Sequence, residues 1–486
     1  MIKLRGITGM LLLFCLGSLT GQVPASHSDR PNVLFIMTDD LSSFIFDYGK
    51  DEVIAPNIRA LAQRGLRFER AYCQAPLCNP SRTSIMTGRY PHENQIWTNG
   101  PHFRGIYPRM KTLPQRFKEN GYHTVDIGKI YHNWGQSIHG DPDSWSEPQV
   151  YNWAAHFQDW YVPGRPYEVH SDLKKGPAVQ CEDVPDEAYL DGRIANAAVE
   201  KLRELRETPF FLAVGFWKPH LPYNAPKKYW DLYDRDHLPP VRYKHPVKGT
   251  PDIAYVDSKE ARSYTDVPNE GPIPGDKKKE LRHGYLAGIS FVDTQIGKVL
   301  DELDRLDLTR KTIVVFLSDH GYHAGEHGQF GKWTNFEIGT RVPLIILTPG
   351  MPDPGVTSKS LVELIDLYPT LLDLCGIELP ANREKLSGLS LVPVIRDPEA
   401  SVRPWAISQI TRPLGADADF TILGSTIRTD RYRYVIWKER KDGSVVAEEF
   451  YDLSHDPLEV KNIVNDSGII KIKDQLNEEL MKFVRK

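Results

Sequence analysis

Short apolar runs of strand length, spread over most of the chain, constrain its fold more than any other feature. Continuous runs lie at residues 32–37, 210–214, 313–317 and 344–347, and a weaker run at 124–127 is interrupted by Asp126. Continuous rather than alternating apolarity predicts strands that are covered on both faces, as in a parallel α/β sheet. Helical spacing relates other apolar residues, namely Tyr285, Ile289, Val292, Ile296 and Val299, and separately Leu361, Ile365 and Leu372. We therefore expect strands and helices to alternate around a parallel sheet.

Two long stretches break this alternation. Residues 132–183 are rich in Trp, Pro, Gly and His, and residues 224–279 are rich in Pro, with little periodicity in either stretch. Long irregular insertions in an α/β domain usually form lids and substrate-binding walls. We expect both insertions to form such walls.

Ionisable residues follow several of the predicted strands closely. They are Asp39 and Asp40 after 32–37, Lys129 and His132 after 124–127, His220 after 210–214, and Asp319 and His320 after 313–317. In open α/β sheets the ligand crevice lies at the carboxyl ends of the strands. These side chains can therefore converge on one site although they are far apart in sequence.

Asp39, Asp40 and Asp319 would place three carboxylates in that crevice. Like charges packed together repel unless a cation joins them, and carboxylate oxygens suit a hard ion such as Ca²⁺ or Mg²⁺. Helix capping would explain Asp39 and Asp40 alone, but the acid at a second strand end favours a metal site. His323 and His327 could instead form a zinc pair on one helix face, which the surrounding glycines and the lack of a cysteine cluster disfavour.

Residues 78–82 read Cys-Asn-Pro-Ser-Arg and form the other candidate site. Pro80 suits the first turn of a helix, so the helix-start amides would face an oxyanion bound near Cys78. Arg82 lies one helical turn after Cys78 and can point to the same place. A buried cysteine before a helix would explain Cys78 alone, but Pro80, Ser81 and Arg82 together favour a site. The candidate anion cradle is completed by Lys129, His132, His220 and Lys332.

This segment resembles the signal at which modifying enzymes convert a cysteine to formylglycine in the type I sulfatases. Cys78, Pro80 and Arg82 match its fixed positions, whereas Asn79 stands where a small residue is more usual. Further stretches resemble motifs of that family, at residues 121–129, 318–328, 331–344 and 450–459. Within the family, the chain is most similar to the iduronate-2-sulfatase branch at residues 214–222, 271–274 and 332–343.

The resemblance implies an alkaline-phosphatase-like fold, with a large mixed, mostly parallel sheet flanked by helices and a smaller C-terminal α+β subdomain. We expect the catalytic domain at residues 26–392 and the subdomain at 393–486. Short strand patterns support the subdomain at 420–423, 432–437 and 448–451, followed by a helix at roughly 469–484.

The resemblance also implies roles for the candidate site residues. One Ca²⁺ would be bound by Asp39, Asp40, the modified Cys78, Asp319 and His320, although the imidazole of His320 departs from the all-oxygen pattern of calcium sites. Arg82 would stabilise the hydroxyls of hydrated formylglycine, and the sulfate would be lined by Lys129, His132, His220 and Lys332. One hydroxyl would attack sulfur, and the other would lose its proton as sulfate leaves. The acid that protonates the leaving oxygen is either His132 or His220.

The implied activity is hydrolysis of sulfate monoesters, with 2-O-sulfated uronic acid or a related sugar of a sulfated polysaccharide as the substrate. The implied maturation partner is a formylglycine-generating or anaerobic sulfatase-maturing enzyme. Two alternatives stay open. One is a formylglycine-dependent phosphonate or phosphodiester hydrolase of the same superfamily, and the other is a non-catalytic glycan-binding relative.

The N-terminus indicates export. Lys3 and Arg5 precede an apolar run at residues 10–16 that is too short to span a bilayer, and small and polar residues follow. We expect a signal peptide at residues 1–25, no later membrane span, and a periplasmic or secreted protein, bacterial rather than lysosomal. The formal net charge of −4 gives no general attraction to nucleic acid, so any site for an anion has to be locally basic.

Overall fold

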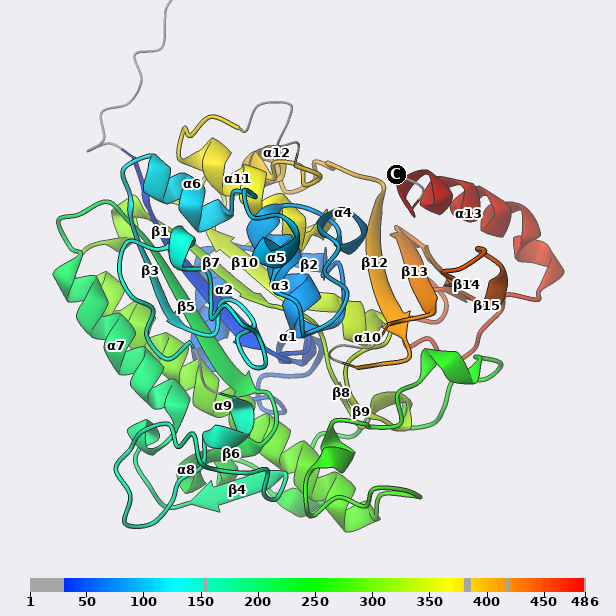
Figure 1. The fold of residues 1–486 in the computed structure, drawn as a ribbon, viewed down its shortest axis with the longest axis horizontal. Coiled ribbons are helices and arrows are strands. Elements are labelled where there is room, and N and C mark those ends of the chain that lie inside the picture. Colours follow the sequence, from blue (N-terminus) through cyan, green and yellow to red (C-terminus); the bar gives the residue numbers. More distant parts are fainter. Residues whose placement is uncertain (1–29, 153–154, 380–385, 416–418, 485–486) are drawn as a thin grey trace, which may run out of the picture.

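The computed structural model describes residues 30–152, 155–379, 386–415 and 419–484 (Figure 1). Its centre is a seven-stranded sheet with the strand order β11-β2-β10-β7-β1-β5-β3. The strands are β1 (Asn32–Asp39), β2 (Leu66–Tyr72), β3 (His123–Gly128), β5 (Phe210–Pro219), β7 (Thr312–Ser318), β10 (Arg341–Leu347) and β11 (Thr357–Glu363). β10 runs antiparallel to β2 and β7, and the other neighbouring pairs are parallel. The predicted α/β class with a mixed, mostly parallel sheet is therefore confirmed.

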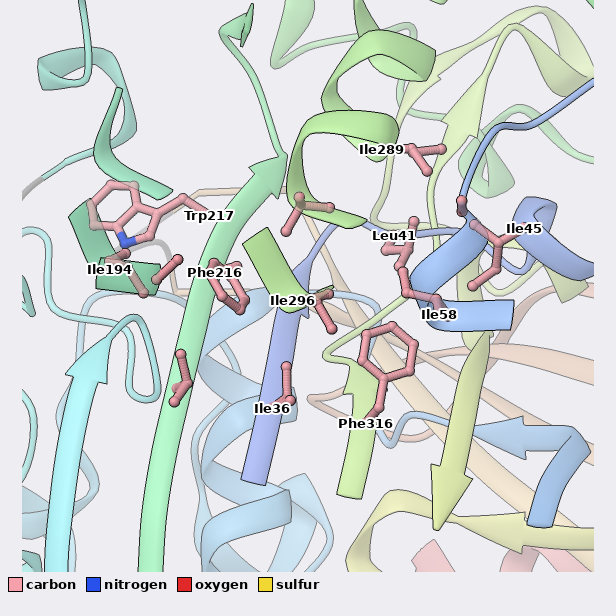
Figure 2. Packing of buried hydrophobic residues seen from close by; sticks show 14 of the residues in the cluster. Ile36, Leu41, Ile45, Ile58, Ile194, Phe216, Trp217, Ile289, Ile296 and Phe316 are labelled. Atoms are coloured by element: carbon pink, nitrogen blue, oxygen red, sulfur yellow. The ribbon is translucent and has the colours of Figure 1, made fainter. Parts of the chain in front are cut away.

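Alternate residues of β1 pack into two different cores, which explains why its apolar run is continuous. Leu34 and Ile36 lie in a core that includes α2 (Pro56–Arg64), α7 (Leu190–Glu204) and α9 (Gly275–Arg305). Val33, Phe35 and Met37 lie in the core on the other face, which includes α3 (Cys78–Thr87), α6 (Leu113–Glu119) and α11 (Leu367–Leu374). Figure 2 shows the first core, where Ile36, Phe316 and Ile296 lie together. Burial on both faces fixes the central strands whose ends carry the site.

A separate antiparallel sheet forms the C-terminal part of the molecule, as predicted. Its order is β12-β13-β14-β15, with β12 (Trp405–Arg412), β13 (Ile422–Thr429), β14 (Tyr432–Glu439) and β15 (Val445–Asp452). Helix α13 (Ile470–Val484) packs on this sheet through Leu476 and Leu480. Helix α12 (Val392–Arg396) straddles the predicted domain boundary at 392/393, and its Val394 and Ile395 pack in a core of the large sheet. The boundary itself stays a prediction.

The two irregular insertions contain few regular elements. Strands β4 (Val179–Glu182) and β6 (Tyr223–Pro226) pair in parallel, and helix α8 (Lys227–Trp230) follows them; all three pack against α9 (Figure 1). The remaining short elements are α1 (Phe44–Asp47), α4 (Pro91–Asn94), α5 (Phe103–Ile106), α10 (Glu337–Thr340), β8 (His323–Ala324) and β9 (Phe330–Gly331). Long loops therefore cover much of the region below the sheet in Figure 1.

Sequence reasoning was wrong or incomplete for several partly polar strands of both sheets. Leu361 lies in β11 and not on a helix with Ile365 and Leu372, of which only Leu372 lies in α11. β11 is an edge strand that carries Ser and Lys, so its apolar residues are too few to show strand periodicity. β2 and β12 are also polar in part and were not predicted, and the strand expected at 420–423 overlaps only the start of β13.

The N-terminal prediction is not addressed by the fold. The expected signal peptide, residues 1–25, lies outside the described residues. Within the described ranges, no helix combines the length and the apolar content that crossing a membrane requires.

Candidate active site

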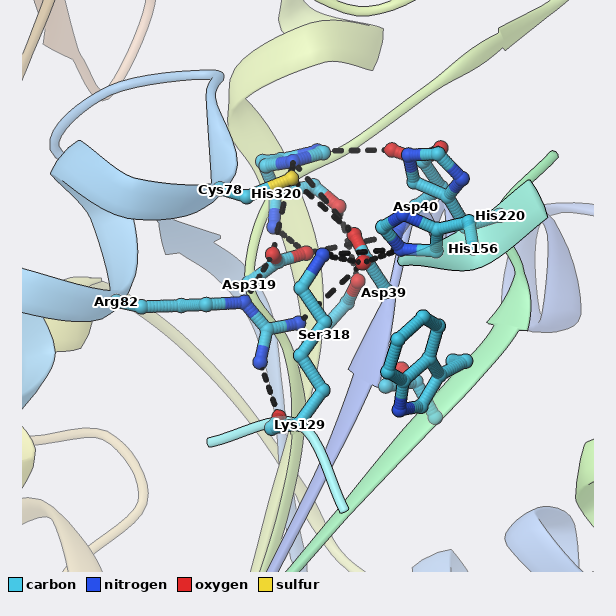
Figure 3. Close-up of polar contacts among 12 residues, drawn as sticks. Asp39, Asp40, Cys78, Arg82, Lys129, His156, His220, Ser318, Asp319 and His320 are labelled. Carbon is cyan, nitrogen blue, oxygen red and sulfur yellow. Dashed lines mark hydrogen bonds and ion pairs between the residues drawn. The ribbon is translucent and has the colours of Figure 1, made fainter. Parts of the chain in front are cut away.

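The carboxyl ends of four neighbouring strands meet at one crevice, where the predicted ionisable residues lie together (Figure 3). Asp39 ends β1, Lys129 follows β3, His220 follows β5, and Asp319 follows β7. Asp40 adopts a left-handed conformation with φ of 65°, which an aspartate tolerates better than most residues. Successive side chains of a strand point to opposite faces, and this turn lets Asp39 and Asp40 both reach the crevice.

A group of ligand atoms suited to a cation lies at the centre of the crevice. Asp39, Cys78, Asp319 and His320 each offer one atom, and these atoms all lie within 4.8 Å of one another. All four residues are buried, and Nδ1 of His320 lies 3.4 Å from Oδ1 of Asp40. Carboxylate oxygens beside one imidazole suit a divalent cation, so the residues present fit the metal that the sulfatase resemblance implies.

Three buried cations face these carboxylates. Nε of Arg82 lies 2.8 Å from Oδ2 of Asp319, and Nζ of Lys332 lies 3.0 Å from Oδ1 of Asp40. Lys129 pairs with Asp39. Burial alone would raise the pKa of Asp39, but Lys129, with help from His220 and Arg82, holds it well below its usual range. Every acid of the crevice therefore has a cation beside it.

Cys78 is the first residue of α3 and is buried at the helix start. Its Sγ lies 3.5 Å from Oδ1 of Asp39 and 3.4 Å from Nε2 of His320. Burial, reinforced by the charge of Asp39, raises the pKa of the Cys78 thiol, so the unmodified side chain is a protonated and weak nucleophile. The unusual Asn79 has a structural role, because its side-chain amide donates to the carbonyls of Thr98 and Pro101.

The sequence did not single out His156 or Glu260, which the two irregular insertions bring into the crevice. The rings of His156 and His220 stack with centroids 3.5 Å apart, and Nε2 of His156 lies 2.9 Å from Oδ2 of Asp39. Glu260 lies 3.0 Å from Nε2 of His220 and 3.1 Å from Nζ of Lys332. Burial, with His220 and Lys129 nearby, lowers the pKa of His156, so its ring is neutral. The only signal for either residue was that its insertion was expected to form a wall.

His132 lies in the crevice without a hydrogen-bond partner. Both of its ring nitrogens are buried and bond to no protein atom among the described residues. Burial, together with the charge of Lys129, lowers the pKa of His132 well below its usual range. A neutral imidazole with no partner is placed to bond a ligand.

The crevice opens into a cavity of about 280 Å³. Its inner wall holds the site residues Cys78, His132, His156, His220, Glu260 and Lys332. Its outer wall includes Lys175 and Lys259 from the insertions, the aromatic rings of Trp134 and Trp333, and Thr411 of β12 in the C-terminal sheet. The cavity thus combines an anionic centre, a ring of cations and aromatic surfaces.

The alternative zinc pair does not form. His323 lies in β8 with Nε2 2.7 Å from the hydroxyl of Thr334, and Nε2 of His327 lies 2.9 Å from the carbonyl of Leu458. Burial lowers the pKa of His323 to about 3 and that of His327 to about 4. Both are neutral histidines bonded within the protein.

Comparisons with known proteins agree with this geometry. A family model described as Sulfatase matches residues 31–377, and one described as N-sulphoglucosamine sulphohydrolase, C-terminal, matches residues 325–486. The chain belongs to the sulfatase family and is a sulfuric ester hydrolase.

Its relatives include the iduronate 2-sulfatase of Homo sapiens, which is 33% identical over 510 residues that cover 91% of this chain and 92% of the relative. Two solved structures share the fold. One, in complex with its substrate D-glucosamine-2-N,6-O-disulfate, has a TM-score of 0.71 at 24% identity and covers 93% of this chain and 97% of its own. The other, a phosphonate monoester hydrolase from Silicibacter pomeroyi, has a TM-score of 0.75 at 23% identity. It covers 93% of this chain and 95% of its own.

Proposed function

We propose that this enzyme removes sulfate from 2-O-sulfated uronic acid, or a closely related acidic sugar, of a sulfated polysaccharide. One observation carries the proposal: buried Asp39, Asp319 and His320 surround Cys78, and buried cations surround them in turn. This arrangement suits a metal ion and a tetrahedral anion side by side. The similarity to an iduronate 2-sulfatase over nearly the whole chain supports the choice of sugar.

We propose that the cation is one Ca²⁺, held by Asp39, Asp40, Asp319, His320 and residue 78. When bound, it would supply positive charge that stabilises an oxygen anion at residue 78. Arg82, fixed by Asp319 at 2.8 Å, adds a permanent charge on the same side. The fit rests on the donor set, because carboxylate oxygens that converge beside residue 78 are the ligands that a hard divalent cation prefers.

We further propose that Cys78 is converted to formylglycine by a formylglycine-generating or anaerobic sulfatase-maturing enzyme. The hydrated aldehyde would supply a hydroxyl nucleophile, which the buried thiol does not. Cys78 is 1% exposed, so the maturing enzyme has to reach it before α3 packs into the fold. A periplasmic or secreted location, which the N-terminus favours, is part of the same proposal.

The other residues of the anion cradle are two lysines and two histidines, and we assign them different roles. Lys129 and Lys332 face the position of a bound sulfate and would offset charge that develops on its oxygens. His220 is the better acid for the leaving oxygen. Its Nδ1 lies 2.6 Å from the carbonyl of Leu221 and its Nε2 3.0 Å from Glu260, so both ring nitrogens face acceptors. His132, by contrast, is held neutral by burial.

Two lysines on the outer wall of the cavity favour an acidic sugar as the substrate. Nζ of Lys175 lies 2.7 Å from the hydroxyl of Ser263, and Nζ of Lys259 lies 3.0 Å from the carbonyl of Leu414. Neither ammonium pairs with a carboxylate in the described part of the chain. A uronate carboxylate beside the sulfate would give them a partner that a neutral sugar lacks.

The test is Cys78→Ala, with the buried Cys73→Ala as a matched control. We expect Cys78→Ala to lower kcat/KM for a sulfate ester by about four orders of magnitude or more, as loss of a nucleophile does, and Cys73→Ala to change it little. Mass spectrometry of the peptide that contains residue 78 should show the aldehyde in active enzyme. Comparable hydrolysis by Cys78→Ala would exclude the mechanism. Faster hydrolysis of phosphonate or phosphodiester substrates than of sulfate esters in the same assay would favour the alternative activity.

A further inference from the structure

A second and larger cavity, of about 570 Å³, lies apart from the catalytic pocket. It is lined by residues 235–245 of the second insertion, by the start of α9, and by residues 324–330 of the loop after β7. No residue lines both cavities. The basic residues in its wall are Arg235, Arg242, Lys244, His245, Lys278, Lys279 and Arg282, against Asp236 as the acidic one.

Only part of this positive charge is neutralised by the protein. Arg282 is buried and pairs with Glu326 at 3.0 Å, which makes it structural. Lys279 pairs with Asp236 at 3.2 Å. For Arg242, Lys244 and Lys278, the described residues provide no carboxylate within ion-pair distance, which leaves three exposed cations around one cavity.

These cations are held in a defined arrangement. The guanidinium of Arg242 lies 4.5 Å above the ring of Tyr48, which limits the positions it can take. Lys278 lies in the first turn of α9, a helix of 31 residues, and Gly275 at that helix start also lines the cavity. The positive end of a helix adds to the potential of nearby cations. In a chain with a formal net charge of −4, this is a local concentration of positive charge with room for a ligand beside it.

The loop that lines this cavity also carries catalytic residues. It leaves the site at Asp319 and His320, lines the basic cavity at Gly325, Gly328 and Phe330, and returns to the site at Lys332. Phe330 N–H donates to the hydroxyl of Ser258 at 2.9 Å, which joins the loop to the segment that carries Lys259 and Glu260. Because the two cavities share no lining residue, a ligand that occupies both has to extend from one to the other.

We propose that the basic cavity is a second binding site for the polysaccharide, taking sulfate or carboxylate groups of sugar units other than the one being hydrolysed. The inference rests on the proposed function, because that function supplies a repeating polyanion as the substrate. A folded nucleic acid is the weaker partner, since its recognition needs a basic surface that extends well beyond a single cavity. This site would raise the affinity of the enzyme for long polysaccharide chains without changing the chemical step.

The test compares the triple variant Arg242→Ala/Lys244→Ala/Lys278→Ala with a control, Lys50→Ala/Lys441→Ala/Lys471→Ala, which removes the same charge from exposed positions elsewhere. Heparin binding is measured directly, and hydrolysis is measured on a sulfated polysaccharide and on a small aryl sulfate. We expect the cavity variant to bind heparin more weakly and to show a higher KM for the polymer, both by on the order of tenfold, with a shallower salt dependence of binding. Its kcat/KM for the aryl sulfate should match the wild type.

Each outcome of this experiment is decisive for the cavity. Equal heparin binding by the cavity variant and the control variant would overturn the proposal, and so would tighter binding of a single-stranded DNA of matched charge that is lost in the same variant. If the wild type cleaves the aryl sulfate but no uronate-containing polymer, the proposed substrate is wrong. Heparin binding, which needs no turnover, still reports on the cavity in that case.

Discussion

Two of the buried charge clusters among the described residues are similar in composition but differ in the groups that lie beside them. The catalytic cluster comprises Asp39, Asp40, Asp319, Arg82, Lys129 and Lys332. The second, here called the junction cluster, joins α10 and β10 to the C-terminal sheet and comprises Glu337, Glu459, Arg341, Arg428 and Arg433. Each has carboxylates and cations within ion-pair distance.

In the junction cluster every charged group has an ion-pair partner within the protein, although Nε of Arg341, Nε of Arg433 and Oε1 of Glu459 make no hydrogen bond to the described residues. The carboxylate of Glu337 accepts from Tyr72 at 2.7 Å, from Arg428 at 3.2 Å and from Arg433. Glu459 lies 2.7 Å from Nε of Arg433 and accepts the backbone N–H of Glu337 at 2.7 Å. In the catalytic cluster the acids surround a thiol, and the neighbouring His132 has no partner for either nitrogen. We therefore expect the junction cluster to hold the two sheets together and the catalytic cluster to bind a ligand.

The largest effect on stability is expected from Glu337→Gln. It leaves buried Arg428 without its acid and takes one of two acids from buried Arg433, and breaking a buried ion pair from one side costs about 3–5 kcal/mol. Denaturant unfolding should show this loss, while kcat/KM for a small sulfate ester stays unchanged. Glu69→Gln, which breaks the half-exposed pair with Arg67, is the control and should cost at most about 1 kcal/mol. A cost for Glu337→Gln as small as that of the control would mean that the junction cluster does not hold the two sheets together.

The pKa of Glu337 allows the same cluster to be tested by pH. Burial alone would raise it, but Arg428, Arg433 and Arg341 hold the pKa of Glu337 at about 2, below its ordinary 4.5. A folded-state pKa below the unfolded value adds stability above pH 4.5 that is lost as pH falls toward 2. The shift corresponds to roughly 3 kcal/mol. Burial raises the pKa of Glu459 to about 7, so that group titrates above this window.

The measurement is the difference in unfolding free energy between the wild type and Glu337→Gln as a function of pH. We expect this difference to shrink by roughly 2.5 kcal/mol as pH falls from about 5.5 to about 2.5, because only the wild type has the carboxylate to protonate. A difference that is independent of pH over this range would show that Glu337 gains nothing from its arginines.

The sequence predicted the centre of the site because strand burial and strand-end position are local signals. The run at 32–37 is apolar on both faces, so its end and the acids Asp39 and Asp40 could be placed without knowing the tertiary structure. The same holds for Asp319 and His320 after β7. Residues 78–82 added the helix start that faces them.

Other parts depended on contacts that no local pattern records. His156 reaches the site through its bond to Asp39 and its stack on His220, both from distant strands. β12 carries buried polar residues because it packs against the catalytic domain: the hydroxyl of Ser408 donates to the carbonyl of Cys73, and Gln409 N–H donates to the carbonyl of Gln74. Such a strand does not look apolar in sequence, so it could not be predicted.

The smallest effect on stability, and the one that separates the two clusters most directly, is expected from His132→Leu. A buried imidazole that lacks hydrogen bonds destabilises the fold, so replacing it with an apolar side chain should raise the free energy of unfolding by ~1 kcal/mol. If the partner of His132 is the substrate, as we propose, the same change should lower kcat/KM at least about tenfold, equal to ~1.4 kcal/mol of transition-state binding.

His327→Leu is the matched control, because His327 is also buried and neutral but its Nε2 is bonded to the carbonyl of Leu458 at 2.9 Å. Removing that half-buried bond should cost about 1 kcal/mol without affecting kcat/KM. Changes of opposite sign in the free energy of unfolding would show that His132, which has no hydrogen bond, is kept for ligand binding. They would also show that His327, which bonds to Leu458, stabilises the fold. If His132→Leu were destabilised like the control, or if it kept full activity, His132 would have only a structural role. It would then not belong to the anion cradle.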